Sequence, residues 1–370
     1  MRVCSATLHH ICMRLKTPFV NSLTTVEERN LILVELEDEL GTKGWGECVA
    51  FSSPWYTEET ITTAWHVMTN FLLPLLQGVT ITSVWEVSKL FAPVRRNPMA
   101  KAGIEGAVWD LFARRQGVAL SSLMGGKPGE VKAGATVGLK ASLAQIVEEV
   151  SYLHHDQGYE RVKVKIKPGR DVDLIHCLRQ RFPQLMLIAD ANSAYTLADL
   201  DHLRLLEPYK LTMIEQPLAA DDIVDHATLA KQLRIPICLD ESITSAEDAR
   251  RALELGSCQV MSIKIGRVGG IAEAIRIHNL CARHKVPVWV GGMLESGVSR
   301  AQHLALATLP NFTIPGDLSA STRYWEQDVT KPEVKVSQGK IRVPSGTGIG
   351  FHIDEERLRA VTVRSLKRQL

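Results

Sequence analysis

The sequence lacks the cysteine pattern of a disulfide-rich or zinc-binding protein. Its seven cysteines are odd in number, widely scattered and never arranged as Cys-x-x-Cys, so we expect neither a disulfide framework nor a zinc site. It also lacks the compositional bias of fibrous and disordered chains, because 45% of its residues are hydrophobic and 23% are charged. We therefore expect a globular, cytoplasmic protein with reduced thiols.

Blocks of like charge and membrane-spanning segments are missing as well. The sequence has 43 lysine and arginine residues and 41 acidic residues, which give a formal net charge of +2. Without a block of positive charge, we expect no binding surface for nucleic acid or an anionic membrane. Residues 1–16 contain several charges and no unbroken apolar stretch, so no secretory signal is expected. Residues 60–85 lack charged side chains, but their apolar residues recur every three or four positions, which predicts an amphipathic helix. These features favour a small-molecule substrate.

The 370 residues exceed one typical domain of about 150 residues. Residues 1–125 predict a small α+β unit, because a hairpin pattern and three helical stretches precede the glycine-rich turn at 125–129. Residues 330–370 are expected to return to this unit through a hairpin that begins at Glu333. Residues 126–329 then form the second, catalytic domain.

Residues 126–329 contain a repeat of about 25 residues, visible when the ends of the apolar runs are compared. Each repeat has room for one strand, one turn and one helix, which predicts parallel βαβ units. Eight units favour a closed (β/α) barrel, and an open doubly wound sheet is the alternative. The predicted strand ends are Val137, Lys165, Asp190, Glu215, Asp240, Lys264 and positions near Gly291 and Asp317.

Three successive strands of the repeat end on a carboxylate, namely Asp190, Glu215 and Asp240. The active site of a parallel barrel lies at the C-terminal strand ends, so three neighbouring ends would bring these carboxylates together. A hard divalent cation, Mg²⁺ first, would relieve their repulsion. The alternative is that each acid only caps the following helix, but the shared spacing favours a metal site.

The strands on either side of these three end on lysine. Lys163 and Lys165 share one strand face because side chains alternate, and Lys264 ends the strand after Asp240. Solvent-facing lysines are the alternative. Two lysines around a metal-held anion suit proton removal next to a carboxylate, since the cation offsets the charge of the enediolate. Lys165 is the candidate base, because Lys163 and the metal would both favour its neutral form.

Together these motifs resemble the enolase superfamily, in its muconate-lactonizing-enzyme-like subgroup and the branch of o-succinylbenzoate synthases and N-acylamino acid racemases. The resemblance covers nearly the whole chain. It implies a modified TIM-type (β/α)7β barrel with an N-terminal α+β capping domain. The motifs that carry it are Lys163-x-Lys165, Asp190-x-Asn192, Glu215-Gln-Pro217, Asp240-Glu-Ser242, Gly291-Gly-Met-Leu-Glu-Ser-Gly297 and Pro315-Gly-Asp317.

The resemblance also implies a role for each matched residue. Asp190, Glu215 and Asp240 would bind Mg²⁺, for which Mn²⁺ could substitute, and Lys165 and Lys264 would be the acid–base pair. Gln216, Glu241 and Arg267 would orient these groups, although Arg267 could instead be a surface charge. The implied substrate-binding residues are Phe19, Trp55, Tyr56, Thr136, Lys163, Asn192, Met293, Ser296 and Asp317.

The activity that the resemblance implies is Mg²⁺-dependent dehydration of a succinyl-hydroxycyclohexadiene carboxylate in menaquinone biosynthesis. The alternative is racemisation of N-acylamino acids (N-succinylamino acids) by both lysines, in the same site. A homo-oligomer is expected. Ser299 and the glycine-free loop 20–24 depart from the family pattern and leave the substrate preference open. Two hypotheses from other functional classes are a Schiff-base lyase and a non-catalytic ligand-binding barrel.

Overall fold

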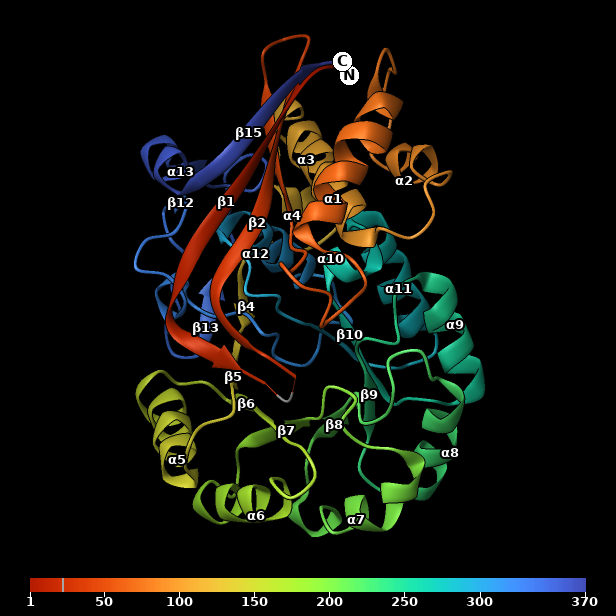
Figure 1. The fold of residues 1–370 in the computed structure, drawn as a ribbon, viewed down its shortest axis with the longest axis vertical. Helices are drawn as coiled ribbons and strands as arrows, with labels where there is room; N and C mark the ends of the chain where they lie inside the picture. The colour runs from red at the N-terminus through yellow and green to blue at the C-terminus, as the bar shows by residue number, and fades with distance from the viewer. Residues whose placement is uncertain (22) are drawn as a thin grey trace.

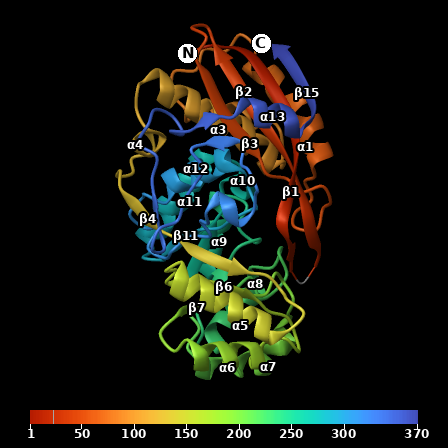
Figure 2. The ribbon, with the colours of Figure 1, turned by 90° about the vertical axis from the view of Figure 1, so that its left-hand side faces the viewer.

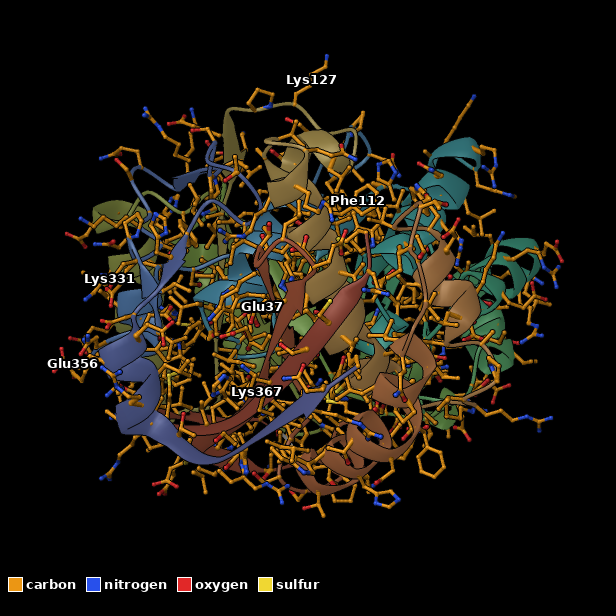
Figure 3. The ribbon with its side chains drawn as sticks, turned by 90° about the horizontal axis from the view of Figure 1, so that it is seen from above. Glu37, Phe112, Lys127, Lys331, Glu356 and Lys367 are labelled. Carbon is orange, nitrogen blue, oxygen red and sulfur yellow. The ribbon has the colours of Figure 1, made fainter. Side chains whose placement is uncertain are left out.

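An antiparallel sheet and a curved parallel sheet dominate the computed structural model, which describes residues 1–21 and 23–370 (Figure 1). The antiparallel sheet has the order β15-β1-β2-β3, and Figure 3 shows it from above with Lys367 on β15 and Glu37 on β2. Strands β1 and β2 of this sheet are long and project towards the parallel sheet (Figure 2). The strand bounds are β1 Val3–Val20, β2 Thr25–Asp38, β3 Lys43–Cys48 and β15 Thr362–Gln369.

Helix α3 (Pro98–Arg115) packs against β3 at very short range. A Cβ atom on Gly46 would lie 2.1 Å from the carbonyl oxygen of Gly103 and 2.5 Å from the amide nitrogen of Ala107, so only glycine allows this approach. The shorter helices of this part are α1 Ile61–Val67, α2 Glu86–Leu90 and α4 Leu120–Leu123. The amphipathic helix expected within 60–85 is α1, continued by a π-helical turn at Met68–Leu72 and a 3-10 turn at Leu73–Leu76.

The second sheet has seven parallel strands in the order β11-β10-β9-β8-β7-β6-β5. Helices alternate with these strands along the chain, which confirms the predicted repeat. The strands are β5 Gly134–Val137, β6 Arg161–Lys165, β7 Met186–Asp190, β8 Met213–Glu215, β9 Ile237–Leu239, β10 Val260–Ile263 and β11 Val288–Val290. The helices are α5 Leu143–Ser151, α6 Val172–Arg181, α7 Leu200–Arg204, α8 Val224–Gln232, α9 Ala246–Leu255, α10 Ile265–Val268, α11 Ile271–Arg283 and α12 Gly297–Leu306.

The eighth predicted unit forms no regular strand, although it closes the barrel. Phe312 makes an isolated parallel bridge to Val288, and Gly316 makes another to Ala133. Pro315 has no N–H group to donate to a strand ladder, so the segment 312–317 joins the neighbouring strands through these bridges and single hydrogen bonds, such as that from the Asp317 amide to the Val290 carbonyl at 2.7 Å. The expected (β/α)7β barrel is confirmed, with an irregular closing segment.

The hairpin expected from Glu333 is present as a tight turn, in which Ser337 and Lys340 exchange two backbone hydrogen bonds, but its expected return to the first unit is wrong. Strand β13 (Lys340–Arg342) pairs with β4 (Glu130–Lys132), next to the barrel, and β12 (Thr330–Lys331) pairs with β14 (His352–Ile353). The returning strand is β15, which follows α13 (Glu355–Val361) and pairs with β1 from Ser5 to Ile11. The division into residues 1–125 with 330–370 and residues 126–329 stays a prediction. Across the described chain, no helix combines the length and the apolar character needed to cross a membrane.

The close contact of β3 with α3 gives a stability prediction. Gly46→Ala should lower the free energy of unfolding by at least about 2 kcal/mol, because its methyl group meets backbone atoms that cannot rotate away. Urea unfolding measures this. Leu40→Ala is the control, since Leu40 is 71% exposed and its loss should change stability by less than about 0.5 kcal/mol. Equal stabilities of the two variants would contradict the packing argument.

Candidate active site

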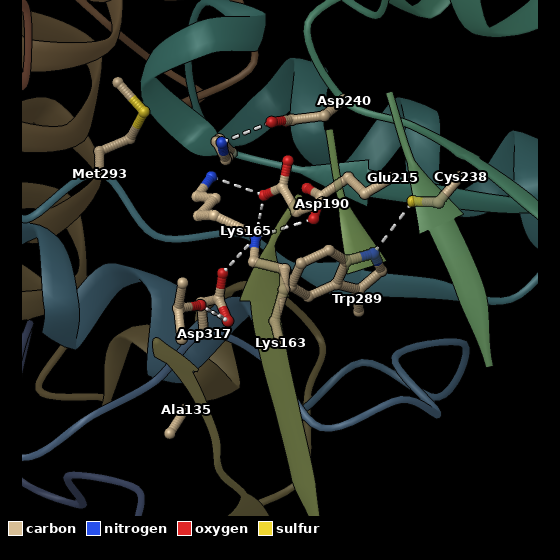
Figure 4. Close-up of polar contacts among 12 residues, drawn as sticks. Ala135, Lys163, Lys165, Asp190, Glu215, Cys238, Asp240, Trp289, Met293 and Asp317 are labelled. Atoms are coloured by element: carbon tan, nitrogen blue, oxygen red, sulfur yellow. Dashed lines mark hydrogen bonds and ion pairs between the residues drawn. The ribbon is translucent and has the colours of Figure 1, made fainter. Parts of the chain in front are cut away.

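The predicted charged residues lie side by side at the C-terminal ends of the parallel strands (Figure 4). Lys165 is the register partner of Asp190, and Asp190 is the partner of Glu215. Asp240 and Lys264 directly follow the last residues of β9 and β10. Five neighbouring strands therefore deliver two lysines and three carboxylates to one end of the barrel.

The ammonium group of Lys163 lies between three carboxylates. Its Nζ is 2.9 Å from Asp190 Oδ2, 2.8 Å from Glu215 Oε2 and 2.9 Å from Asp317 Oδ2. Burial alone would lower the pKa of Lys163, but the three carboxylates outweigh burial and raise it. Because Lys163 and Lys165 are only 3% and 7% exposed, the alternative of solvent-facing lysines is wrong.

Lys165 and Lys264 approach the same cavity from two separate strands, β6 and β10, with β7, β8 and β9 between them. Lys165 Nζ donates to Asp190 Oδ2 at 2.7 Å and to Asn192 Oδ1 at 2.6 Å. Lys264 Nζ donates to Asp240 Oδ2 at 2.7 Å and to the hydroxyl oxygen of Tyr56 at 2.9 Å. Each amine is thus held by its own carboxylate and its own neutral partner.

Asp190, Glu215 and Asp240 are the residues that could hold a hard cation. No three acidic, histidine or cysteine side chains of residues 1–21 and 23–370 form a ready-made metal site, because lysine and arginine groups pair with the carboxylates instead. Glu215 Oε1 is nevertheless buried without a hydrogen-bond partner among the described residues. Burial and the neighbouring Asp190 raise the pKa of Glu215 to about 7. An oxygen-binding divalent cation would satisfy this cluster of buried carboxylates.

Three further residues, which were expected to orient this cluster, make hydrogen bonds or ion pairs with it or with its neighbours. Gln216 accepts a hydrogen bond from the Asp240 amide at 2.9 Å, and Glu241 accepts one from Asn192 Nδ2 at 2.8 Å. Arg267 is completely buried, forms an ion pair with Asp240 and donates to the Ser262 carbonyl at 2.6 Å. Its interpretation as a surface charge is therefore wrong.

A cavity opens in front of the two lysines. It holds about 60 Å³ and brings together most of the predicted substrate-binding residues: Phe19, Trp55, Tyr56, Thr136, Lys163, Asn192, Met293 and Asp317. Sequence reasoning missed the other lining residues: Asn21, Phe51, Gly292, Leu294, Arg300 and Tyr324. Gly292 and Leu294 lie within the quoted motif 291–297, and Asn21 lies in the glycine-free loop, so these three carried a sequence signal without being assigned to the cavity. Ser22 of the glycine-free loop lies outside the described residues.

Ser296 does not reach the cavity. It is completely buried and begins helix α12, where its hydroxyl donates to Glu47 Oε2 at 2.6 Å and its amide donates to Glu47 Oε1 at 2.9 Å. The Ser299 amide also donates to Glu47 Oε2, at 2.9 Å. Burial raises the pKa of Glu47 to about 7. A carboxylate of β3 thus caps a barrel helix, and Ser296 serves this contact instead of the substrate.

Arg161 is a further residue that the sequence did not reveal. It is completely buried at the start of β6, and its guanidinium donates to the Pro315 carbonyl at 2.9 Å, the Ala135 carbonyl at 3.2 Å and Asp317 Oδ1 at 2.6 Å. It lies 5.0 Å from the ring centroid of Trp289. Arg161 therefore ties the irregular closing segment to β5 and β6, and it holds the carboxylate that contacts Lys163.

Arg161→Met should lower the free energy of unfolding by about 3–5 kcal/mol, because it leaves Asp317 without one cation and two buried carbonyl groups without a donor. Urea unfolding measures this loss. Arg204→Met is the control, since Arg204 pairs with Asp201 on the surface and should contribute less than about 1 kcal/mol. An Arg161 variant as stable as this control would show that the closing segment does not depend on the guanidinium.

A lysine on each side of a carboxylate cluster, at the mouth of a capped parallel barrel, is the arrangement of a barrel enzyme that works by acid–base chemistry. Two family models match the chain. The mandelate racemase / muconate lactonizing enzyme N-terminal domain matches residues 4–125, and the enolase C-terminal domain-like model matches residues 145–357. The chain belongs to this mandelate racemase / muconate lactonizing enzyme family of the enolase superfamily, which confirms the resemblance.

Individual relatives are similar over nearly their whole length. An o-succinylbenzoate synthase from Geobacillus stearothermophilus is 53% identical over 96% of this chain and 94% of its own. An N-succinylamino acid racemase from Thermus thermophilus is 42% identical over 98% of both chains. Both activities expected from the sequence are therefore represented among the enzymes that this chain is similar to.

Solved structures confirm the fold. A member of the enolase superfamily from Listeria innocua has a TM-score of 0.97 and 41% identity, over 100% of this chain and 99% of its own. A dipeptide epimerase from Cytophaga hutchinsonii, solved with Mg and the dipeptide D-Ala-L-Val, has a TM-score of 0.89 and 25% identity, over 99% of this chain and 100% of its own. This epimerase shows that the superfamily includes a member with bound magnesium and a small-molecule ligand.

Proposed function

We propose that this chain is a Mg²⁺-dependent o-succinylbenzoate synthase, a carbon–oxygen lyase that dehydrates a succinyl-hydroxycyclohexadiene carboxylate in menaquinone biosynthesis. The observation that carries the proposal is the position of Lys165 and Lys264 on one cavity, each paired with a carboxylate at a strand end. Several o-succinylbenzoate synthases that are 42–53% identical over nearly the whole chain support this substrate.

The proposed metal ligands are Asp190, Glu215 and Asp240, with Mg²⁺ as the ion and Mn²⁺ as a substitute. Oxygen donors suit both ions, and the magnesium in the dipeptide epimerase supports the choice. When bound, Mg²⁺ offsets the negative charge that develops on the substrate carboxylate. In the structure, these three carboxylates contact Lys163, Lys165, Lys264 and Arg267, so an ion held there would share them with these cations.

In the dehydration, Lys165 as a neutral amine takes the α-proton, and the C–H electron pair is held in the enediolate of the substrate. This pair then forms the new double bond as the C–O bond breaks. Lys165 returns its proton to the departing hydroxyl, so that water leaves. Lys264 stays protonated beside Asp240 and Tyr56, where it stabilises the negative intermediate.

The second candidate function is racemisation of N-succinylamino acids in the same site. The observation that favours it is that Lys264 also lines the cavity, so an amine is available on each face of an α-carbon. One lysine would remove the proton while the other, as an ammonium group, delivers a proton to the opposite face. The racemase relative from Thermus thermophilus supports this second activity.

The remaining assignments follow from the cavity. We propose that Phe19, Trp55, Tyr56, Thr136 and Met293 shape the space for the substrate, since all five line it. The free cysteines support a reducing, cytoplasmic location. A homo-oligomeric state is part of the proposal and is tested by light scattering.

Glu215→Gln should abolish dehydration and the thermal stabilisation that Mg²⁺ gives the wild type, because it removes one of three charged ligands. Turnover and the Mg²⁺-induced shift of the melting temperature are the two measurements. Glu254→Gln is the control, because Glu254 pairs with Arg250 on the surface and should leave both quantities unchanged. Wild-type turnover by Glu215→Gln in chelator-treated buffer would rule out the three-carboxylate site.

Lys264→Arg should separate the two activities. Arginine keeps the positive charge beside Asp240 but cannot act as a base at neutral pH. We therefore expect the rate of racemisation to fall about 10³-fold. Dehydration should survive in part, because it needs only the charge at this position. Polarimetry and the ultraviolet absorbance of the aromatic product measure the two rates. Lys264→Ala, which removes the charge, should lose both reactions. Robust racemisation by Lys264→Arg would refute the opposed-lysine mechanism.

A further inference from the structure

The cations that line the catalytic cavity are already matched by buried carboxylates. Lys163 contacts three, Lys165 contacts Asp190 and Lys264 contacts Asp240. Arg300, on the wall, lies 3.3 Å from Glu295 Oε1. Each of these cations therefore already has a carboxylate of the protein beside it. A substrate with a second, distal carboxylate has to place that group elsewhere.

A groove adjoins the catalytic cavity, because the two share Phe19, Thr136 and Tyr324 as lining residues. The groove holds about 370 Å³, against about 60 Å³ for the cavity. It lies between the end of β1, the end of α5 with the turn that follows it, and the loop after β5, which approach one another in Figures 1 and 2. Thr136 therefore separates the space in front of the lysines from the groove by no more than one lining residue.

The charges in the groove leave one positive charge unmatched. Lys140 Nζ lies 2.9 Å from Glu149 Oε2, and Arg323 Nη2 lies 2.8 Å from Glu149 Oε1. Among the described lining residues, Lys140, Glu149 and Arg323 are the only ones that carry a full charge at neutral pH. Two cations share one carboxylate, so the groove matches a ligand group of charge −1.

Arg323 is also fixed relative to the catalytic cavity. Its Nη2 donates to the Thr136 carbonyl at 2.8 Å, and the Thr136 hydroxyl donates to Asp317 Oδ1 at 2.8 Å. Arg170 adds a further cation at the rim, where its Nη1 donates to the Lys140 carbonyl at 3.5 Å. The side chains of Lys140, Arg323 and Glu149 are 27%, 18% and 25% exposed, so a carboxylate in the groove can reach them.

We propose that this groove binds the distal carboxylate of a succinyl group, and that Lys140 and Arg323 are specificity-determining residues for succinylated substrates. The inference rests on the proposed function, because the o-succinylbenzoate synthase and N-succinylamino acid racemase relatives share a succinyl group in their names. One subsite for that group explains how one cavity serves a cyclohexadiene and an amino acid. The ring or the amino acid lies at the lysines, and the common acyl chain lies in the groove.

The test compares substrates with and without the distal carboxylate in the Mg²⁺-loaded full-length enzyme. Lys140→Met should raise KM for the dehydration substrate about tenfold with kcat little changed, because it removes one charge-assisted contact. It should also reduce the preference for an N-succinylamino acid over its N-butanoyl analogue, which keeps the chain length and lacks the charge. Glu149→Gln should shift KM in the opposite direction, since it frees both cations.

Lys132→Met is the matched control, because Lys132 pairs with Glu160 on the surface, away from the groove, and should change neither quantity. Arg323→Gln is a second variant, and Lys140→Met keeps the test decisive if loss of the Arg323 contacts unfolds the loop. An active wild type whose KM and acyl preference are unchanged in Lys140→Met overturns the groove assignment alone. A wild type that converts neither succinylated substrate overturns the proposed function instead.

Discussion

The shared contact of Lys163 with three buried carboxylates is the constraint on which the interior of the barrel depends. Asp190 and Glu215 come from β7 and β8, and Asp317 comes from the closing segment. An unpaired carboxylate in this position would lower the free energy of unfolding by about 3–5 kcal/mol. Because Arg161 holds the other oxygen of Asp317, the charge balance of the site and the closure of the barrel depend on the same group of side chains.

The carboxylates of this group are paired with cations, but one of their buried oxygens has no hydrogen-bond partner among the described residues. A free carboxylate oxygen of this kind suits a metal site. The pKa of Asp190 is lowered, since Lys163 and Lys165 outweigh burial, whereas burial and Asp190 itself raise the pKa of Glu215 to about 7. Neighbouring carboxylates with unequal pKa values are typical of functional sites. The buried Glu215 oxygen that has no partner among the described residues marks the same point.

The charged groups and the aromatic side chains that line the cavity come from different parts of the chain. The acid–base and carboxylate groups follow strands β6 to β10, whereas Phe19, Trp55 and Tyr56 belong to the first sixty residues and meet these groups at the cavity. Glu47 fixes the relative position of the two parts, because it caps α12 from β3. Under the proposed function, changes near these aromatic residues are expected to alter substrate choice while the groups for proton transfer stay in place.

The sequence by itself determined the strands and the residues at their ends, because the alternation of apolar side chains and the regular repeat are local properties. Lys165, Asp190 and Glu215 end their strands at the predicted positions. Only the tertiary structure decided which partners these residues meet. Ser296 meets Glu47, which is 249 residues away, and Arg161 meets Asp317, which is 156 residues away. Such contacts leave no periodic signal in the chain, since they depend on how the closed barrel and its cap bring distant backbone together.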